Sequence, residues 1–183
     1  MREFLKQGEG FMEMIYRDIT KRIGELNILH RIYIHRAAAE YGVYSGQIPI
    51  LQYISSHENC TQKQLADFLQ VSAPSIATSV KRMQKSGLIQ KTADEGDLRC
   101  NRLSATEKGN EISRRAAAAF NTINRRMFEG FTQDECKQFY YYLNRMTQNL
   151  ESDEFKDKTM FALIDTMTAE KNRLFEQKGE NKC

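Results

Sequence analysis

The sequence contains no tryptophan, only two prolines in 183 residues, and no tract rich in glycine and serine. Proline breaks helices and Gly/Ser tracts form flexible linkers, so their scarcity favours a mostly helical chain without a flexible interdomain linker. Hydrophobic residues make up 40% of the chain, which is enough for a packed core. The length fits one domain or slightly more.

Long apolar runs and paired cysteines are also missing. No run approaches the roughly 18 residues that a membrane span requires, and the first ten residues lack the apolar centre of a signal peptide, so we expect a cytoplasmic protein. The four cysteines, Cys60, Cys100, Cys136 and Cys183, include no C-x-x-C pair. We therefore expect reduced thiols rather than a disulfide framework or a zinc site.

The residue groupings that enzymes and metal sites need are absent from the sequence. His30, His35 and His57 form no H-x-x-x-H motif, and His57-x-x-Cys60 is at most half of a metal site. We find no nucleophile with a base, no cofactor loop and no metal cluster. The sequence predicts neither an enzyme nor a bound metal or cofactor.

Helical periodicity dominates both ends of the chain. A long helix is expected from Phe11 to Glu40, apolar on more than one face, and a second from Gln47 to Ser56. Further amphipathic helices are expected over 106–128 and from Thr132, whose spacing to Glu135 fits a capping box. A last helix, capped by Ser152 or Asp153, should carry Met160 and Ile164 on one side.

The central stretch from Thr61 to Gly109 predicts two short helices, a hairpin and the start of a third helix. Thr61 and Gln64 fit a capping box, and Ser72 is a good N-cap for a helix with Pro74 in its first turn and Gly87 after its end. This second helix has an apolar stripe and an opposite stripe of small polar groups and a cation, namely Ser75, Thr78, Ser79 and Arg82. Such side chains suit close approach to the edges of base pairs, although a solvated helix face has the same composition.

A hairpin is predicted after this helix, with one strand near 88–92, an acidic turn over 93–98 and a return strand from Arg99 to Ser104. Its arginines, Arg99 and Arg102, suit contact with a narrow, electronegative minor groove, and Asp97 is placed to hold the Arg99 guanidinium. A surface hairpin with scattered charge is the alternative.

The central stretch resembles the MarR (multiple-antibiotic-resistance regulator) family of winged helix-turn-helix regulators. Three segments carry the resemblance, in this order along the chain: TQKQLADFLQVSAPSIATSVKRMQKSGLI, the Asp97-x-Arg99 tip and SATEKG. Ala105 stands where a leucine is usual, and Leu98 and Cys100 are atypical tip residues. The resemblance extends to about Leu150. It implies a mainly α fold with a β-hairpin wing, an obligate homodimer with intertwined terminal helices, and an effector pocket between those helices and the DNA-binding lobe.

On this basis the sequence predicts a DNA-binding transcriptional regulator, more often a repressor in this family, released by a small-molecule effector. We expect Ser72 to Arg82 to read the major groove of a pseudo-palindromic operator and Arg99 the minor groove. The residues expected at phosphates are Thr61, Lys63, Lys81, Lys91 and Arg102.

The expected division is a dimerisation helix over 1–44, a winged lobe over 45–109, dimerisation helices over 110–150 and a helical extension over 151–183. Two alternatives stay open. One is thiol-based redox sensing through Cys60, near a helix N-terminus that would favour a thiolate, or through Cys100 beside Arg99. The other is a winged-helix module used only for protein contacts.

Overall fold

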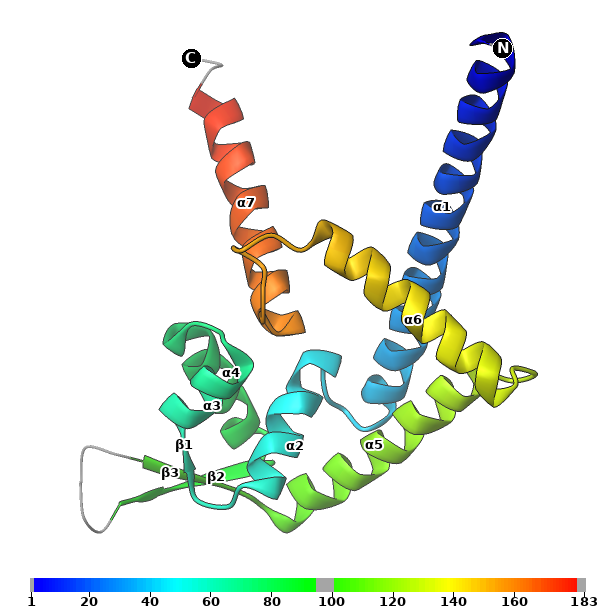
Figure 1. The fold of residues 1–183 in the computed structure, drawn as a ribbon. Coiled ribbons are helices and arrows are strands. Elements are labelled where there is room, and N and C mark those ends of the chain that lie inside the picture. Colours follow the sequence, from blue (N-terminus) through cyan, green and yellow to red (C-terminus); the bar gives the residue numbers. More distant parts are fainter. Residues whose placement is uncertain (1, 95–100, 181–183) are drawn as a thin grey trace.

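The computed structural model describes the backbone of residues 2–94 and 101–180. Two long helices, α1 and α7, rise from one side of a winged lobe (Figure 1). The elements in chain order are α1 (Arg2–Glu40), a 3-10 turn η1 (Ser45–Gln47), α2 (Ile48–Ser56), β1 (Cys60–Thr61), α3 (Gln62–Leu69), α4 (Ala73–Lys85), β2 (Ile89–Ala93), β3 (Asn101–Ala105), α5 (Glu107–Met127), α6 (Gln133–Leu150) and α7 (Met160–Glu180). The mainly α, winged helix-turn-helix fold class is therefore confirmed.

Local capping explains where several helices begin. The Thr61 side chain accepts a hydrogen bond from the Gln64 backbone N–H, while the Gln64 side chain accepts one from the Thr61 N–H, which completes the predicted capping box. The same arrangement joins Thr132 and Glu135 at the start of α6. Each box satisfies backbone donors that the first helical turn leaves without partners.

The sheet has three antiparallel strands in the order β1-β3-β2, one more than the predicted hairpin. In the hairpin Ile89 pairs with Ala105 and Lys91 with Leu103, as a wing requires. The additional strand, β1, pairs Cys60 with Leu103. It ties the base of the wing to the start of α3.

The core of the lobe forms where α2, α3, α4, the sheet and α5 meet. The largest fully buried side chains include Leu51, Leu65, Ile76, Met83 and Leu103. The apolar stripe predicted for α4 is confirmed, since Ile76, Val80 and Met83 are all buried. On α2 the side chains of Ile50, Leu51 and Ile54 are buried as well. The polar stripe of α4 is left on the outside.

Helix α1 is largely uncovered by its own chain. Its large hydrophobic side chains include Ile19, Leu26 and Ile28, which are 44%, 40% and 61% exposed. Its C-terminal part contacts α5, where His30 and the Asn124 side chain lie 3.0 Å apart. An apolar surface of this length in one chain indicates that something else covers it.

The structure corrects two expected helix boundaries. Helix α1 begins at Arg2 rather than near Phe11. The last helix begins at Met160, after a turn, and its first turn is capped by Thr159, whose hydroxyl accepts from the Ala162 N–H at 3.2 Å, rather than by Ser152 or Asp153. Among the described residues no helix is long and apolar enough to cross a membrane.

Candidate nucleic-acid interface

The two helices α3 and α4 form a helix-turn-helix whose turn is Gln70-Val71. Gln70 ends α3 in the left-handed conformation, with φ 54°, which reverses the chain in one residue. The Val71 N–H then donates to the Ala66 carbonyl at 3.1 Å, and the Ser72 side chain accepts from the Ser75 N–H to start α4. This short turn places α4 across the end of α3.

The outer face of α4 carries the predicted polar stripe. Ser75, Thr78 and Arg82 are exposed and Ser79 is half-buried. The Thr78 hydroxyl donates to the Pro74 carbonyl at 3.0 Å, and the Ser72 and Ser75 hydroxyls lie 2.9 Å apart. These bonds use donors but leave lone pairs on the hydroxyl oxygens, which can accept hydrogen bonds from amino groups on base edges.

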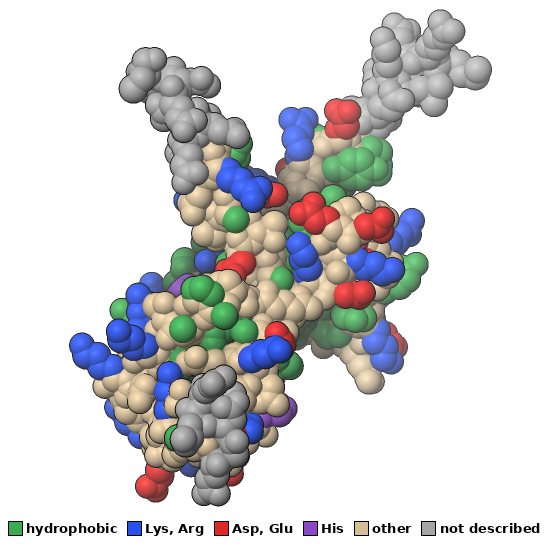
Figure 2. All heavy atoms as spheres, turned by 90° about the vertical axis from the view of Figure 1, so that its left-hand side faces the viewer, with side chains coloured by type: hydrophobic (Ala, Val, Ile, Leu, Met, Phe, Trp, Pro, Cys, Tyr) green, Lys and Arg blue, Asp and Glu red, His purple; other side chains and the backbone are tan. Residues whose placement is uncertain are grey.

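Both helices of the helix-turn-helix also carry exposed cations. Lys63 on α3 and Lys81, Arg82 and Lys85 on α4 are all exposed. Figure 2 shows blue Lys and Arg side chains projecting from the winged lobe in the lower part of the view. Positive charge beside a small polar stripe suits a polyanion whose backbone flanks a readable groove.

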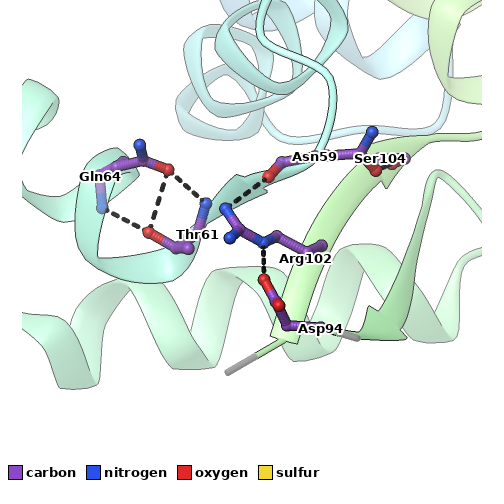
Figure 3. A network of polar contacts seen from close by, with 6 residues as sticks. All are labelled: Asn59, Thr61, Gln64, Asp94, Arg102 and Ser104. Carbon is purple, nitrogen blue, oxygen red and sulfur yellow. Dashed lines mark hydrogen bonds and ion pairs between the residues drawn. The ribbon is translucent and has the colours of Figure 1, made fainter. Parts of the chain in front are cut away.

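The base of the wing is held by a polar cluster that the sequence did not predict (Figure 3). Arg102, expected at a phosphate, forms an ion pair with Asp94 and donates to the Asn59 carbonyl at 3.3 Å. The Ser104 hydroxyl donates to the Asn59 side-chain oxygen at 3.1 Å. Arg102 thus braces the hairpin against the loop before β1, and Asp94 offsets its charge.

Asn59 is a residue that sequence reasoning missed, although a signal was available. Asparagine tolerates positive φ better than most residues, and Asn59 has φ 61° just before β1. An asparagine directly before a short β-prone stretch is therefore a candidate turn residue. Its backbone and side chain both bind β3 side chains here.

The remaining predicted residues are placed as follows. Lys91 is half-buried and pairs across the sheet with buried Leu103, so its stem lies on the inner face of the wing. The Thr61 hydroxyl is already used in the capping box. Asp97 and Arg99, with Cys100, fall outside the described residues.

Cys60 does not have the environment expected of a reactive thiol. Its side chain is 5% exposed in β1, and burial raises the pKa of the Cys60 thiol above its ordinary value. Burial and a raised pKa both disfavour the thiolate that was expected near the start of α3. Among the described residues no three His, Cys, Asp or Glu side chains are grouped to hold a metal ion.

Two of the cavities among the described residues are lined mainly by apolar side chains and lie away from the outer face of α4. A groove of about 740 Å³ lies between α1 and α6, with Ile19, Ile23, Leu26, Phe139 and Leu143 among its lining residues. A second cavity of about 460 Å³ lies between α2, α3 and the start of α7, where Tyr53 stacks on His57 with ring centroids 4.2 Å apart. Tyr53 and His57 both line this second cavity.

Comparison with known proteins supports this geometry. A sequence model described as MarR family matches residues 41–99. The chain is 28% identical to the uncharacterized HTH-type transcriptional regulator YybA of Bacillus subtilis, over 59% of this chain and 72% of that one. It is 24% identical to the repressor MdtR of the same organism, over 62% of this chain and 73% of that one.

Solved structures of MarR-family regulators share the fold of this chain. A MarR transcriptional regulator from Methanosarcina mazei is 26% identical and superposes with a TM-score of 0.58, covering 73% of this chain and 96% of that chain. The fold of MepR from S. aureus, solved as a DNA complex, superposes with a TM-score of 0.61 at 17% identity, covering 71% of this chain and 96% of that chain.

Proposed function

We infer from these comparisons that the chain is a member of the MarR family of helix-turn-helix transcriptional regulators. On this premise we propose that it is a homodimeric, cytoplasmic repressor, not an enzyme, that a small-molecule effector releases from its operator. In this proposal residues 45–109 form the DNA-binding lobe. Residues 1–44 and 110–150 supply the dimer interface, and residues 151–183 are an extension.

The observation that carries the proposal is the outer face of α4. Ser75, Thr78 and Arg82 are exposed, whereas Ile76, Val80 and Met83 are buried, and the cations Lys63 of α3 and Lys81 of α4 are exposed as well. A helix with such a face enters a major groove about 12 Å wide, with hydroxyls at base edges and cations at phosphates. The MepR structure, a complex with DNA, supports this use of the shared fold.

The wing would contact the adjacent minor groove of the DNA through Arg99 and a DNA phosphate through Lys91. Arg102, paired with Asp94, would contribute mainly by holding the wing against Asn59 rather than by neutralising a phosphate. A wing fixed at its base loses less conformational freedom when it binds, which favours affinity.

The uncovered surface of α1 supports the dimer. Ile19 and Leu26 of α1 and Leu143 of α6 line an apolar groove that the single chain leaves open. A second copy related by a two-fold axis would cover this groove and place two α4 helices on one side of a duplex. The repressor role is supported by the resemblance to MdtR, whose name states that activity.

The test begins with genomic fragments selected by binding to the protein. A two-fold dimer should select a pseudo-palindrome with half-site centres about 10 base pairs apart, or one helical turn. Inserting about five base pairs between the half-sites rotates one by half a turn and should abolish tight binding in an electrophoretic shift assay. Unchanged affinity after that insertion would contradict the dimer arrangement.

The same assay separates the proposal from the two alternatives. A winged-helix module used only for protein contacts would shift no short duplex. A redox sensor acting through Cys60 would release DNA under peroxide, which the burial and raised pKa of the Cys60 thiol disfavour.

A further inference from the structure

The segment before α7 folds back onto the turn of the helix-turn-helix. Its residues lie within the extension beyond the region that resembles the MarR family. In Figure 1 the lower end of α7 lies near α2 and the α3–α4 pair, while the rest of α7 rises away from the lobe. Phe161 packs against the lobe core and Ala162 is buried.

Three hydrogen bonds join the two segments. The Gln70 side-chain carbonyl accepts from the Thr159 N–H at 2.8 Å, and its amide N–H donates to the Asp157 carbonyl at 3.1 Å. The Thr159 hydroxyl donates to the Leu69 carbonyl at 2.7 Å and accepts from the Ala162 N–H. We call Leu69, Gln70, Asp157 and Thr159 the turn brace.

The backbone at both ends of the turn brace is unusual in the same way. Gln70 has φ 54° and Asp157 has φ 57°, in the left-handed region that favours glycine or asparagine. A glycine at position 70 would relieve the strain, but only a long amide both accepts from the Thr159 N–H and donates to the Asp157 carbonyl. The contacts to the extension therefore explain why glutamine occupies this position.

The turn brace acts on the start of the reading helix. Gln70 is two residues before Ser72, the N-cap of α4, and three before Ala73, where α4 begins. Thr159 is also the cap of α7, so its hydroxyl couples the first turn of α7 to the last carbonyl of α3. Any displacement of the α3–α4 turn relative to the segment before α7 must break these bonds.

We propose that Gln70 and Thr159 are positioning residues for DNA recognition, through which the C-terminal extension holds the α3–α4 turn in the conformation that fits the operator. This inference rests on the proposed function for its DNA readout. Without the turn brace the turn samples other positions, and apparent affinity falls in proportion to the fraction of molecules that remain competent to bind. Both side chains are uncharged, so the salt dependence of binding stays the same.

The test uses the full-length dimer and an operator selected by its own binding. Thr159→Val keeps the shape of the side chain but removes the hydroxyl, and should weaken binding on the order of tenfold if about a tenth of the molecules stay competent. Thr159→Ser restores the hydroxyl and should bind like the parent. Thr166→Val is the matched control, because the Thr166 hydroxyl bonds only within α7, to the Ala162 carbonyl at 2.9 Å.

A second variant separates positioning from stability. Gln70→Asn tolerates the left-handed backbone but has an amide too short to span both partners. It should weaken DNA binding while the melting temperature changes little. Asparagine adopts the left-handed conformation at position 70 with less strain than glutamine, and this gain in stability offsets the loss of the two hydrogen bonds. A merely stabilising contact would lower the melting temperature and leave the affinity of the folded protein unchanged.

Hydrogen exchange provides a readout that does not depend on DNA. The Val71 N–H, bonded to the Ala66 carbonyl, should exchange faster in Thr159→Val and at the parent rate in Thr166→Val. Parent-like exchange of Val71, or parent-like DNA affinity in Thr159→Val, would overturn the positioning role. If the parent itself binds no selected duplex, the proposed function fails, and the exchange rates still decide whether the extension holds the turn.

Discussion

Replacing Gly109 by alanine should destabilise the protein, although the same change in most helix interiors is stabilising. Gly109 is buried in the first turn of α5, beside the chain that leads from α4 into the wing. A Cβ added there would overlap the Leu88 carbonyl oxygen and lie 3.0 Å from the Leu88 carbonyl carbon and 3.3 Å from Cδ1 of Leu51. The obstacle is backbone, which cannot move aside as a flexible side chain would.

The magnitude follows from two opposing effects. Overpacking of a close contact costs roughly 1 to 3 kcal/mol, and an overlap with backbone belongs at or above the upper end of that range. The better helix propensity of alanine returns about 1 kcal/mol. The expected net loss is therefore about 2 kcal/mol or more, and the melting temperature of a chain of this size should fall by roughly 4 to 8 °C.

Thermal unfolding followed by circular dichroism measures this loss. Gly46→Ala is the control, because Gly46 is exposed in η1 and a Cβ there meets no atom within 4 Å. The control should stay within about 0.5 kcal/mol of the parent. A Gly109→Ala protein as stable as the parent would refute the close packing of α5 on Leu88.

Three further changes test other parts of the account. Ile19→Asp places a charge in the groove between α1 and α6 and should give monomers or insoluble protein in sedimentation; a soluble dimer that binds DNA would contradict the interface. Cys60→Ser should leave the peroxide response of DNA binding as in the parent, because the Cys60 thiol is buried and burial raises its pKa. Hydrogen bonds from the Thr132 backbone and hydroxyl lower the pKa of the Glu135 carboxyl. The parent should therefore be more stable than Glu135→Gln above the ordinary glutamate pKa. This difference in stability should be lost as the pH falls through the lowered pKa. Equal pH dependence of the two melting temperatures would refute that coupling.

Much of the helical layout could be predicted because its signals are local. A capping box needs only residues three apart, so Thr61 with Gln64 and Thr132 with Glu135 were identifiable from spacing. The same holds for Gly87, which follows α4 with φ 70°. The stripes of α4 also follow from periodicity, since burial of Ile76 and its neighbours fixes which face remains outside.

What could not be predicted depends on contacts between distant segments. Strand β1 is two residues long and exists because Cys60 pairs with Leu103. Arg102 was interpreted from its charge alone, whereas its partners, Asp94 and Asn59, follow from the hairpin register and the loop before β1. The start of α7 was misplaced because Thr159 becomes the cap while also bonding to the Leu69 carbonyl.

The central claim is that the face of α4 with its flanking cations binds duplex DNA. Fluorescence anisotropy titrations at several salt concentrations test it with two exposed lysines, Lys81 on α4 and Lys137 on α6. Each phosphate contact contributes about 0.9 to the slope of log affinity against log salt, so Lys81→Ala should lower the slope by about two units in a symmetric dimer. Lys137→Ala, whose side chain pairs with Asp134 at 3.1 Å away from this face, should keep the parent slope. Equal slopes for the two variants would contradict the account.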